Sequence, residues 1–144
     1  MALQIVFEGE NHFILDILFG ALAVRNTTLR LYTNDITPGN SDTDASFTEA
    51  ESGWGYSAKT LTRGSWTITQ GSGSTKTYAT YAEQDFTFAT HDGGTDYVYG
   101  YYITFDDGGT QRVLGAERFP ERQLISTSLT KSVTPKIELS DLAA

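Results

Sequence analysis

The chain of 144 residues contains no cysteine. A disulfide framework, a thiolate nucleophile and a cysteine-ligated zinc site are therefore excluded. Histidine is nearly as scarce, because His12 and His91 are the only two, and a three-histidine metal site is excluded as well. His12 is expected to begin a helix and His91 to lie exposed at a hairpin tip. No Gly-x-Ser-x-Gly nucleophile elbow is present to act with either of them, so a hydrolase of that type is not expected.

Basic residues are also few. The chain has 10 Lys and Arg against 18 Asp and Glu, a net charge of −8, and no basic cluster. We therefore expect no binding to nucleic acid through its phosphates. The only long apolar run, residues 13–24, contains Asp16 and is too short to cross a bilayer, so we expect no membrane span. The first basic residue, Arg25, follows this run, and no export signal is expected.

Residues that favour strands are abundant, with 21 Thr, 8 Tyr and 8 Phe. The length leaves room for a single core, so residues 1–144 are predicted to form one β-rich domain. Alternating segments separated by Gly-rich turns follow one another through residues 65–119 and indicate antiparallel hairpins. The predicted fold is mainly β, an antiparallel sandwich or small barrel, with one N-terminal α-helix.

That helix is predicted over residues 12–24. Asn11 can act as its N-cap, and apolar residues recur behind it at helical spacing. The predicted helix is apolar almost all round, so it must be covered on several sides, by the sheet or by a second subunit.

Strand patterns are clearest in two places. Residues 28–33 alternate as a half-buried strand, and residues 96–105 alternate with apolar side chains on both faces. One face of the second strand is predicted to carry Tyr97, Tyr99, Tyr101, Ile103 and Phe105, and the other Val98, Gly100, Tyr102 and Thr104. Both faces should be at least partly covered. Near the C-terminus, Pro135 predicts an edge strand or a strand start.

Residues 34–55 form a long polar loop in this interpretation, and a loop of such length marks a contact surface. Its first part contains oxygen ligands of the kind that Ca²⁺ prefers. These are Asp35, Asn40, Asp42 and Asp44. Their spacing does not match the twelve-residue calcium loop, so solvation of the loop is the preferred interpretation and a calcium site over residues 35–44 is the alternative.

Two pairs of carboxylates invite comparison with a glycosidase, in which one acid protonates the substrate and the other attacks it. They are Glu49 with Glu51 and Asp106 with Asp107. The second pair lies in Asp-Asp-Gly-Gly, which is favoured turn chemistry. We therefore expect turns, no catalytic residues and no cofactor.

Aromatic residues near the end of the loop provide candidates for contact with a partner. Trp54 and Tyr56 stand beside glycines and, with Trp66 and the tyrosine-rich strand, fit two interpretations. One is an aromatic platform that stacks sugars or packs a partner, since aromatics are enriched in interface cores, and the other is filling of the core. The contact candidates of the long loop are Thr37, Pro38, Asn40, Asp42, Phe47, Trp54 and Tyr56.

A second group of contact candidates is Arg118, Phe119, Pro120 and Arg122. Its two arginines flank an apolar pair in an otherwise acidic chain. They are interpreted either as docking an acidic edge of a partner or as pairing with Glu117 and Glu121.

Several strings distributed over nearly the whole chain resemble small structural proteins of tailed bacteriophages. They are "LRLYTNDITPG", "FTEAESGWGYSAKTLT", "GYYITFDDGGTQRVLGAERFPE" and "VTPKIELS". The resemblance implies a virion component, most plausibly a capsid decoration or cement protein like those of long-tailed cyanophages. Such a protein binds the outer surface of the major capsid protein shell and stabilises it, and the resemblance carries no catalytic residues.

The expected setting is therefore the capsid surface of a virion assembled in the host cytoplasm. The expected partners are the major capsid protein and further copies of the chain, as a dimer or trimer, since linked sites raise avidity. Two alternatives stay open: a tail or fibre module that binds a receptor glycan or joins tail components, and a hydrolase of host polysaccharide. The hydrolase would need a carboxylate with a raised pKa in a cleft.

Overall fold

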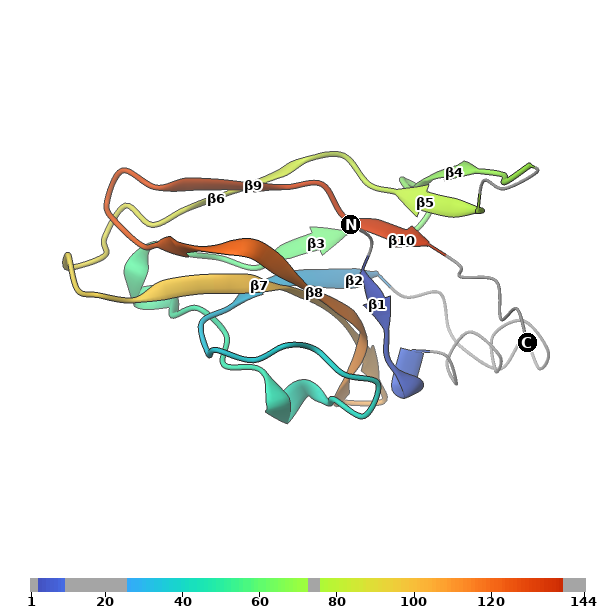
Figure 1. The fold of residues 1–144 in the computed structure, drawn as a ribbon, viewed down its shortest axis with the longest axis horizontal. Helices are drawn as coiled ribbons and strands as arrows, with labels where there is room; N and C mark the ends of the chain where they lie inside the picture. Colours follow the sequence, from blue (N-terminus) through green and yellow to red (C-terminus); the bar gives the residue numbers. More distant parts are fainter. Residues whose placement is uncertain (1–2, 10–25, 73–75, 139–144) are drawn as a thin grey trace.

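The computed structural model describes residues 3–9, 26–72 and 76–138. The chain is mainly β, and its named strands pair antiparallel in three sheets that form a sandwich-like arrangement (Figure 1). The predicted fold class is confirmed. The predicted helix over residues 12–24 lies outside the described residues, and residues 7–9 form a helical turn that precedes it in sequence.

The central layer is a five-stranded sheet with the order β1-β8-β7-β2-β3. Its strands are β1 (Gln4–Ile5), β2 (Thr27–Tyr32), β3 (Lys59–Leu61), β7 (Tyr97–Asp107) and β8 (Thr110–Leu124). The predicted Asp-Asp-Gly-Gly turn joins β7 to β8, with φ of 63° at Gly108 and 94° at Gly109. The Asp106 carboxylate accepts the Gly109 N–H at 2.6 Å, so this acid stabilises the turn.

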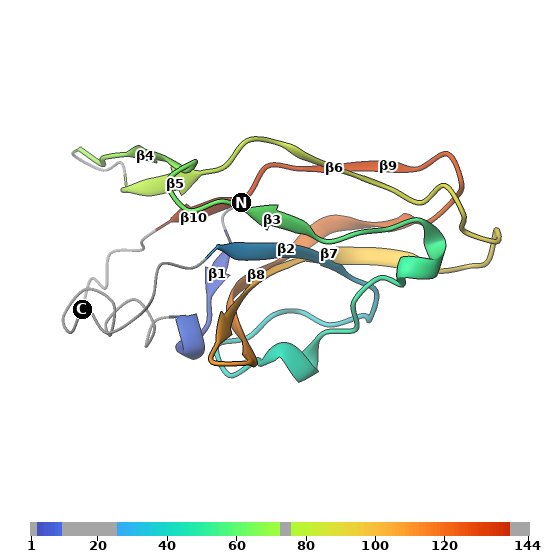
Figure 2. The ribbon, with the colours of Figure 1, turned by 180° about the vertical axis from the view of Figure 1, so that it is seen from behind.

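A second layer lies over one face of this sheet, as Figures 1 and 2 show from opposite sides. It contains a three-stranded sheet, β10-β5-β4, and the pair β6-β9. The bounds are β4 (Thr67–Thr69), β5 (Tyr78–Thr80), β6 (Gln84–Thr87), β9 (Thr130–Val133) and β10 (Lys136–Glu138). Pro135 directly precedes β10, an end strand of its sheet, and its carbonyl accepts the Tyr81 N–H at 3.0 Å, so the predicted strand start is confirmed.

Each face of the central sheet has its own core. Between the layers, Leu29, Ile103 and Phe86 are among the side chains that pack in the larger cluster. On the opposite face, Tyr32 and Tyr102 pack against Phe47, which lies in the long connection from β2 to β3. This connection contains two 3₁₀ turns, η1 (Asp44–Ser46) and η2 (Ser52–Trp54), and runs beneath the sheet in Figure 1. The loop predicted from its polar composition therefore also covers a sheet face.

The predicted alternation along β7 is correct in its second half and wrong in its first. Val98 packs in the cluster of Tyr101, whereas Tyr99 packs with Tyr102 on the opposite face. The cause is a shift in the pairing with β8, where residues 119–122 lie opposite the single residue Tyr99. Both faces are covered, as expected.

Candidate functional site

Arg118, one of the predicted contact residues, binds the long loop beside the other predicted group. Arg118 of β8 donates from Nη1 to the carbonyl of Ile36 at 2.7 Å and from Nη2 to Oδ1 of Asp35 at 2.6 Å. Both acceptors lie in the loop that follows β2. Arg118 thus joins β8 to loop residues that lie about eighty positions earlier in the chain, so that the two segments share one surface.

Arginine and tyrosine side chains stack on this surface. The guanidinium carbon of Arg118 lies 5.2 Å from the ring centroid of Tyr99, and that of Arg122 lies 4.1 Å from the centroid of Tyr97. The two rings are 6.3 Å apart, and Arg122 donates to the Tyr99 hydroxyl at 3.4 Å. We call these four residues the arginine–tyrosine surface. Stacking restricts both guanidinium groups; that of Arg118 is bound to the loop, whereas that of exposed Arg122 can still bind an acceptor.

Arg122 differs from Arg118 in its charge environment. Arg118 is half-buried and forms an ion pair with Asp35. Arg122 is exposed and forms no ion pair with any residue that the structure describes. The interpretation that both arginines pair with neighbouring glutamates is wrong for Arg118, because Glu117 instead accepts from the Tyr101 hydroxyl at 2.7 Å. The hydrogen bond to Tyr99 raises the pKa of Arg122, so this side chain stays charged.

The neighbouring loop residues shape this surface. Thr37 and Asn40 are exposed, and Pro38 and Asp42 are half-buried. The Asp42 carboxylate accepts the Gly39 N–H at 2.7 Å, and the Asn40 carbonyl accepts the Phe7 N–H at 3.0 Å.

The acidic residues of this loop do not converge as a calcium site requires. Asp35 is engaged by Arg118, and Asp42 by the backbone of its own turn. In the ranges that the structure describes, no three His, Asp or Glu side chains are grouped so as to hold a metal ion. Burial raises the pKa of Asp44, which lies in η1. Asp35 and Asp42 are thus bound to protein groups of the loop and of β8.

Phe119 and Pro120 lie where β8 departs from its pairing with β7. Phe119 is half-buried, 6.1 Å from the Tyr101 ring centroid, with Lys131 Nζ 3.9 Å from its own centroid. Pro120 is exposed. Phe119 therefore packs in the cluster between the layers, whereas Tyr99 packs on the opposite face, and Pro120 is accessible from outside.

The expected aromatic platform does not assemble. Tyr56 is 4% exposed and stacks on Phe86, with ring centroids 5.6 Å apart. Phe47 is 7% exposed and stacks on Tyr102 at 4.7 Å. Tyr56 and Phe47 are therefore core residues and not contact residues. The reason is that the apolar surface of the sheet must be covered, and the loop supplies these two rings to cover it.

The two tryptophans pack separately. Half-buried Trp54 lies edge-on to His91 at 5.0 Å, and Trp66 lies edge-on to Tyr81 at 5.3 Å. His91 is 2% exposed, which corrects the expected exposed position. Its Nε2 lies 3.1 Å from Oδ2 of Asp96, and its Nδ1 accepts the Gly93 N–H at 3.2 Å, so the ring organises the turn in which it lies.

Glu49, a member of one predicted carboxylate pair, belongs to a half-buried polar network. The Tyr56 hydroxyl accepts the Leu31 N–H at 3.1 Å and donates to Glu49 Oε1 at 3.0 Å. The other carboxylate oxygen binds Arg30, which also donates to Thr104 at 3.1 Å. Both Glu49 oxygens therefore hold the long loop to β2.

We expect Tyr56→Phe to reduce the free energy of unfolding by about 1–3 kcal/mol, because the buried Leu31 N–H and the Glu49 carboxylate each lose a partner. Urea titration measures this change. The matched control is Tyr81→Phe, where the tyrosine accepts the N–H of Thr62 at an exposed position. Water can replace that hydrogen bond, so the free energy of unfolding of the control should fall by less than about 0.5 kcal/mol. Equal losses in the two variants would contradict the role of burial.

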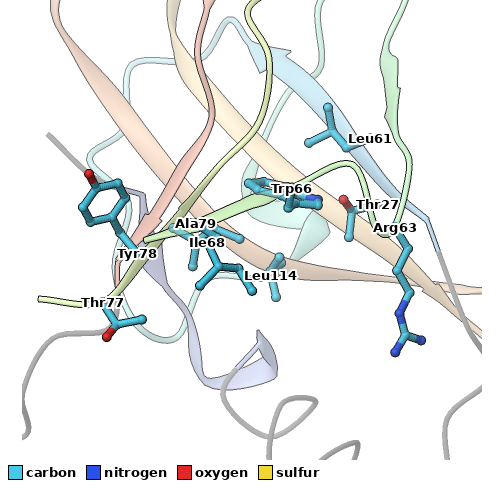
Figure 3. Close-up of a pocket in the computed structure, with 10 residues that line it drawn as sticks. Thr27, Leu61, Arg63, Trp66, Ile68, Thr77, Tyr78, Ala79 and Leu114 are labelled. Carbon is cyan, nitrogen blue, oxygen red and sulfur yellow. The ribbon is translucent and has the colours of Figure 1, made fainter. Parts of the chain in front are cut away.

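An apolar cavity of about 330 Å³ lies between the three-stranded sheet and the central sheet (Figure 3). Its apolar lining residues are Leu61, Trp66, Ile68, Ala79, Leu114 and Ile137. Arg63, Thr27, Thr77 and Tyr78 complete the described lining, which includes no carboxylate. A glycosidase needs two carboxylates facing its substrate, and the described walls of this cavity offer neither.

Comparison with known proteins found no match for this chain among protein-family models, curated proteins or solved structures. Among the described residues, no helix has the length and apolar character needed to span a membrane.

Proposed function

We propose that this chain is a non-enzymatic structural protein of a tailed-phage virion, a capsid decoration protein that binds the outer surface of the major capsid protein shell and stabilises it. Its resemblance to small phage structural proteins supports this role. The observation that carries the proposal is the exposed guanidinium of Arg122, which stacks on Tyr97 and has no carboxylate partner among the described residues.

The chemistry of the arginine–tyrosine surface fits a docking role. Arginine and tyrosine are enriched among the residues that dominate binding energy at protein interfaces. The tyrosine rings hold Arg122 in place before binding, so less side-chain entropy is lost on association. Arg122 is a cationic group within a chain of net charge −8, and its guanidinium is suited to bind an acidic side chain on the shell.

The proposed protein acts in many copies. A homo-oligomer, dimer or trimer, multiplies modest contacts with the shell, because linked sites bind with higher avidity than single ones. Neither a cofactor nor a chemical step is part of this role.

We expect Arg122→Ala to raise the Kd for capsids lacking this protein at least about tenfold, because it removes the guanidinium that faces the shell. Cosedimentation with purified capsids measures this effect. Arg63→Ala is the matched control, since Arg63 is also exposed but lies at the cavity. Because Arg122 is exposed, its variant should retain the melting temperature of the parent. Equal binding by the two variants would contradict the proposed surface.

Quantitative mass spectrometry of virions separated into heads and tails tests the location. A copy number in heads comparable with that of the major capsid protein is the expected result. A few copies confined to tails would instead identify a tail or fibre module. Absence from particles would refute the structural role altogether.

A further inference from the structure

Strand β4 is an open edge of the three-stranded sheet. It pairs with β5 through Thr67–Thr80, Ile68–Ala79 and Thr69–Tyr78, and no described strand pairs with its other side. All three β4 residues are exposed, and Ile68 is 73% exposed. An edge strand presents unpaired N–H and C=O groups, so β4 can accept another strand.

This edge lacks the devices that usually prevent pairing. Residues 64–72 contain neither a charged residue nor a proline, although the chain has 10 basic and 18 acidic residues. The pairing of β4 with β5 runs without a register shift. Edge strands of soluble proteins are usually protected by charges, prolines or bulges, and β4 is protected only by its shortness. The centre of this unprotected edge is an exposed isoleucine.

The sequence of β4 fits a second copy of itself. Antiparallel pairing centred on Ile68 places Ile68 opposite its copy and Thr67 opposite Thr69 of the other chain, so the central pair is apolar and both flanking pairs are threonine pairs, which are favourable across strands. A twofold axis brings identical side chains together and would set like charges against each other in a charged strand. In a chain with a net charge of −8, the uncharged segment 64–72 avoids that repulsion.

We propose that β4 pairs antiparallel with β4 of a second copy and joins the two three-stranded sheets into one six-stranded sheet. Ile68 and Ala79 lie side by side in the wall of the apolar cavity (Figure 3). The second Ile68 continues this wall across the twofold axis and covers apolar surface that is otherwise exposed. The interface rests on β4 alone and does not depend on the assignment to a virion.

Sedimentation of the full chain in solution tests the interface. We expect a concentration-dependent dimer, and a weak one, because a three-residue strand buries little area. Ile68→Lys should raise the dimer Kd at least about tenfold, since it places two like charges opposite each other. Leu124→Lys is the control, because Leu124 is also an exposed aliphatic residue but lies at the end of β8. This control should dimerise as the parent does.

The absence of cysteine permits a direct second test. Ile68→Cys should form an intermolecular disulfide, because residues directly opposite in antiparallel strands have Cα atoms about 4.5–5.5 Å apart, within the range that a disulfide spans. Thr127→Cys, at an exposed position outside the strands, should link much more slowly. A parent that sediments as a monomer at every concentration would overturn the proposal. So would a trimer, unimpaired dimerisation of Ile68→Lys, or equal cross-linking at the two cysteines. None of these results depends on capsid binding, so the two proposals fail separately.

Discussion

Gly100→Ala should reduce the free energy of unfolding by at least about 3 kcal/mol or prevent folding altogether. A Cβ at this position would lie 2.2 Å from the carbonyl oxygen of Glu117 and 2.4 Å from the hydroxyl oxygen of Tyr32. The first contact is with backbone of β8, and the Tyr32 ring is fully buried, so neither neighbour can move without disturbing the sheet. Overpacking in a core usually costs about 1–3 kcal/mol, and contacts this short exceed the usual case.

Gly53→Ala is the matched control for this variant. Nothing lies within 4 Å of a Cβ built at Gly53, in the exposed turn η2. Its unfolding free energy should stay within about 0.5 kcal/mol of the parent value. Thermal and urea unfolding followed by circular dichroism measure both variants. A Gly100→Ala protein as stable as Gly53→Ala would contradict the close packing of Tyr32 over Gly100.

We expect alkaline unfolding as the second large effect. Burial is the main cause that raises the pKa values of the core tyrosines well above their ordinary value of about 10. These residues are Tyr32, Tyr56, Tyr101 and Tyr102. Above about pH 10 the unfolded chain loses these hydroxyl protons while the folded chain keeps them. The folded state is therefore at its full stability below about pH 10, and its free energy of unfolding falls as the pH rises further. At about pH 11 each of these tyrosines lowers the free energy of unfolding by about 1.4 kcal/mol, and the four together lower it by about 6 kcal/mol. This loss is comparable with the whole stability of a typical domain.

Urea titration at neutral pH and near pH 11 measures this loss, with tyrosinate absorbance recorded alongside. Tyrosinate from the core tyrosines should appear only as the structure unfolds. Tyr102→Phe keeps the ring and removes one titrating group, so it should reduce the alkaline loss by about 1.4 kcal/mol near pH 11. An unchanged alkaline loss in this variant would contradict the role of burial.

Local patterns predicted most of the strands and their class. Glycine pairs and Asp-Gly sequences mark turns because few other residues tolerate positive φ, and the turn at Gly108 and Gly109 has that conformation. Pro135 marks the start of β10 because it cannot donate a ladder hydrogen bond. The alternation along β7 failed where residues 119–122 of β8 lie opposite Tyr99, because a shift in pairing depends on both strands.

The sequence predicted the arginines of the candidate site but not the tyrosines on which they stack. Arg118 and Arg122 stand out in an acidic chain, but their stacking partners Tyr99 and Tyr97 lie on another strand, and no signal within residues 118–122 identifies them. Phe47 illustrates the opposite error, because a lone aromatic in a polar loop resembles a contact residue until the sheet face that it covers is known.

The sequence by itself determined what this protein lacks and what its strands are made of. Absent cysteines exclude thiol chemistry, the acidic balance of charge disfavours nucleic-acid binding through phosphates, and threonine, tyrosine and phenylalanine favour a β fold, because these properties depend on residue type or near neighbours. Only the tertiary structure decided that the long loop covers the second face of the sheet, that Tyr56 and Phe47 are core, and that β4 lies at the edge of its sheet among the described strands. Each of these depends on contacts between segments distant in the chain, which a local pattern does not encode.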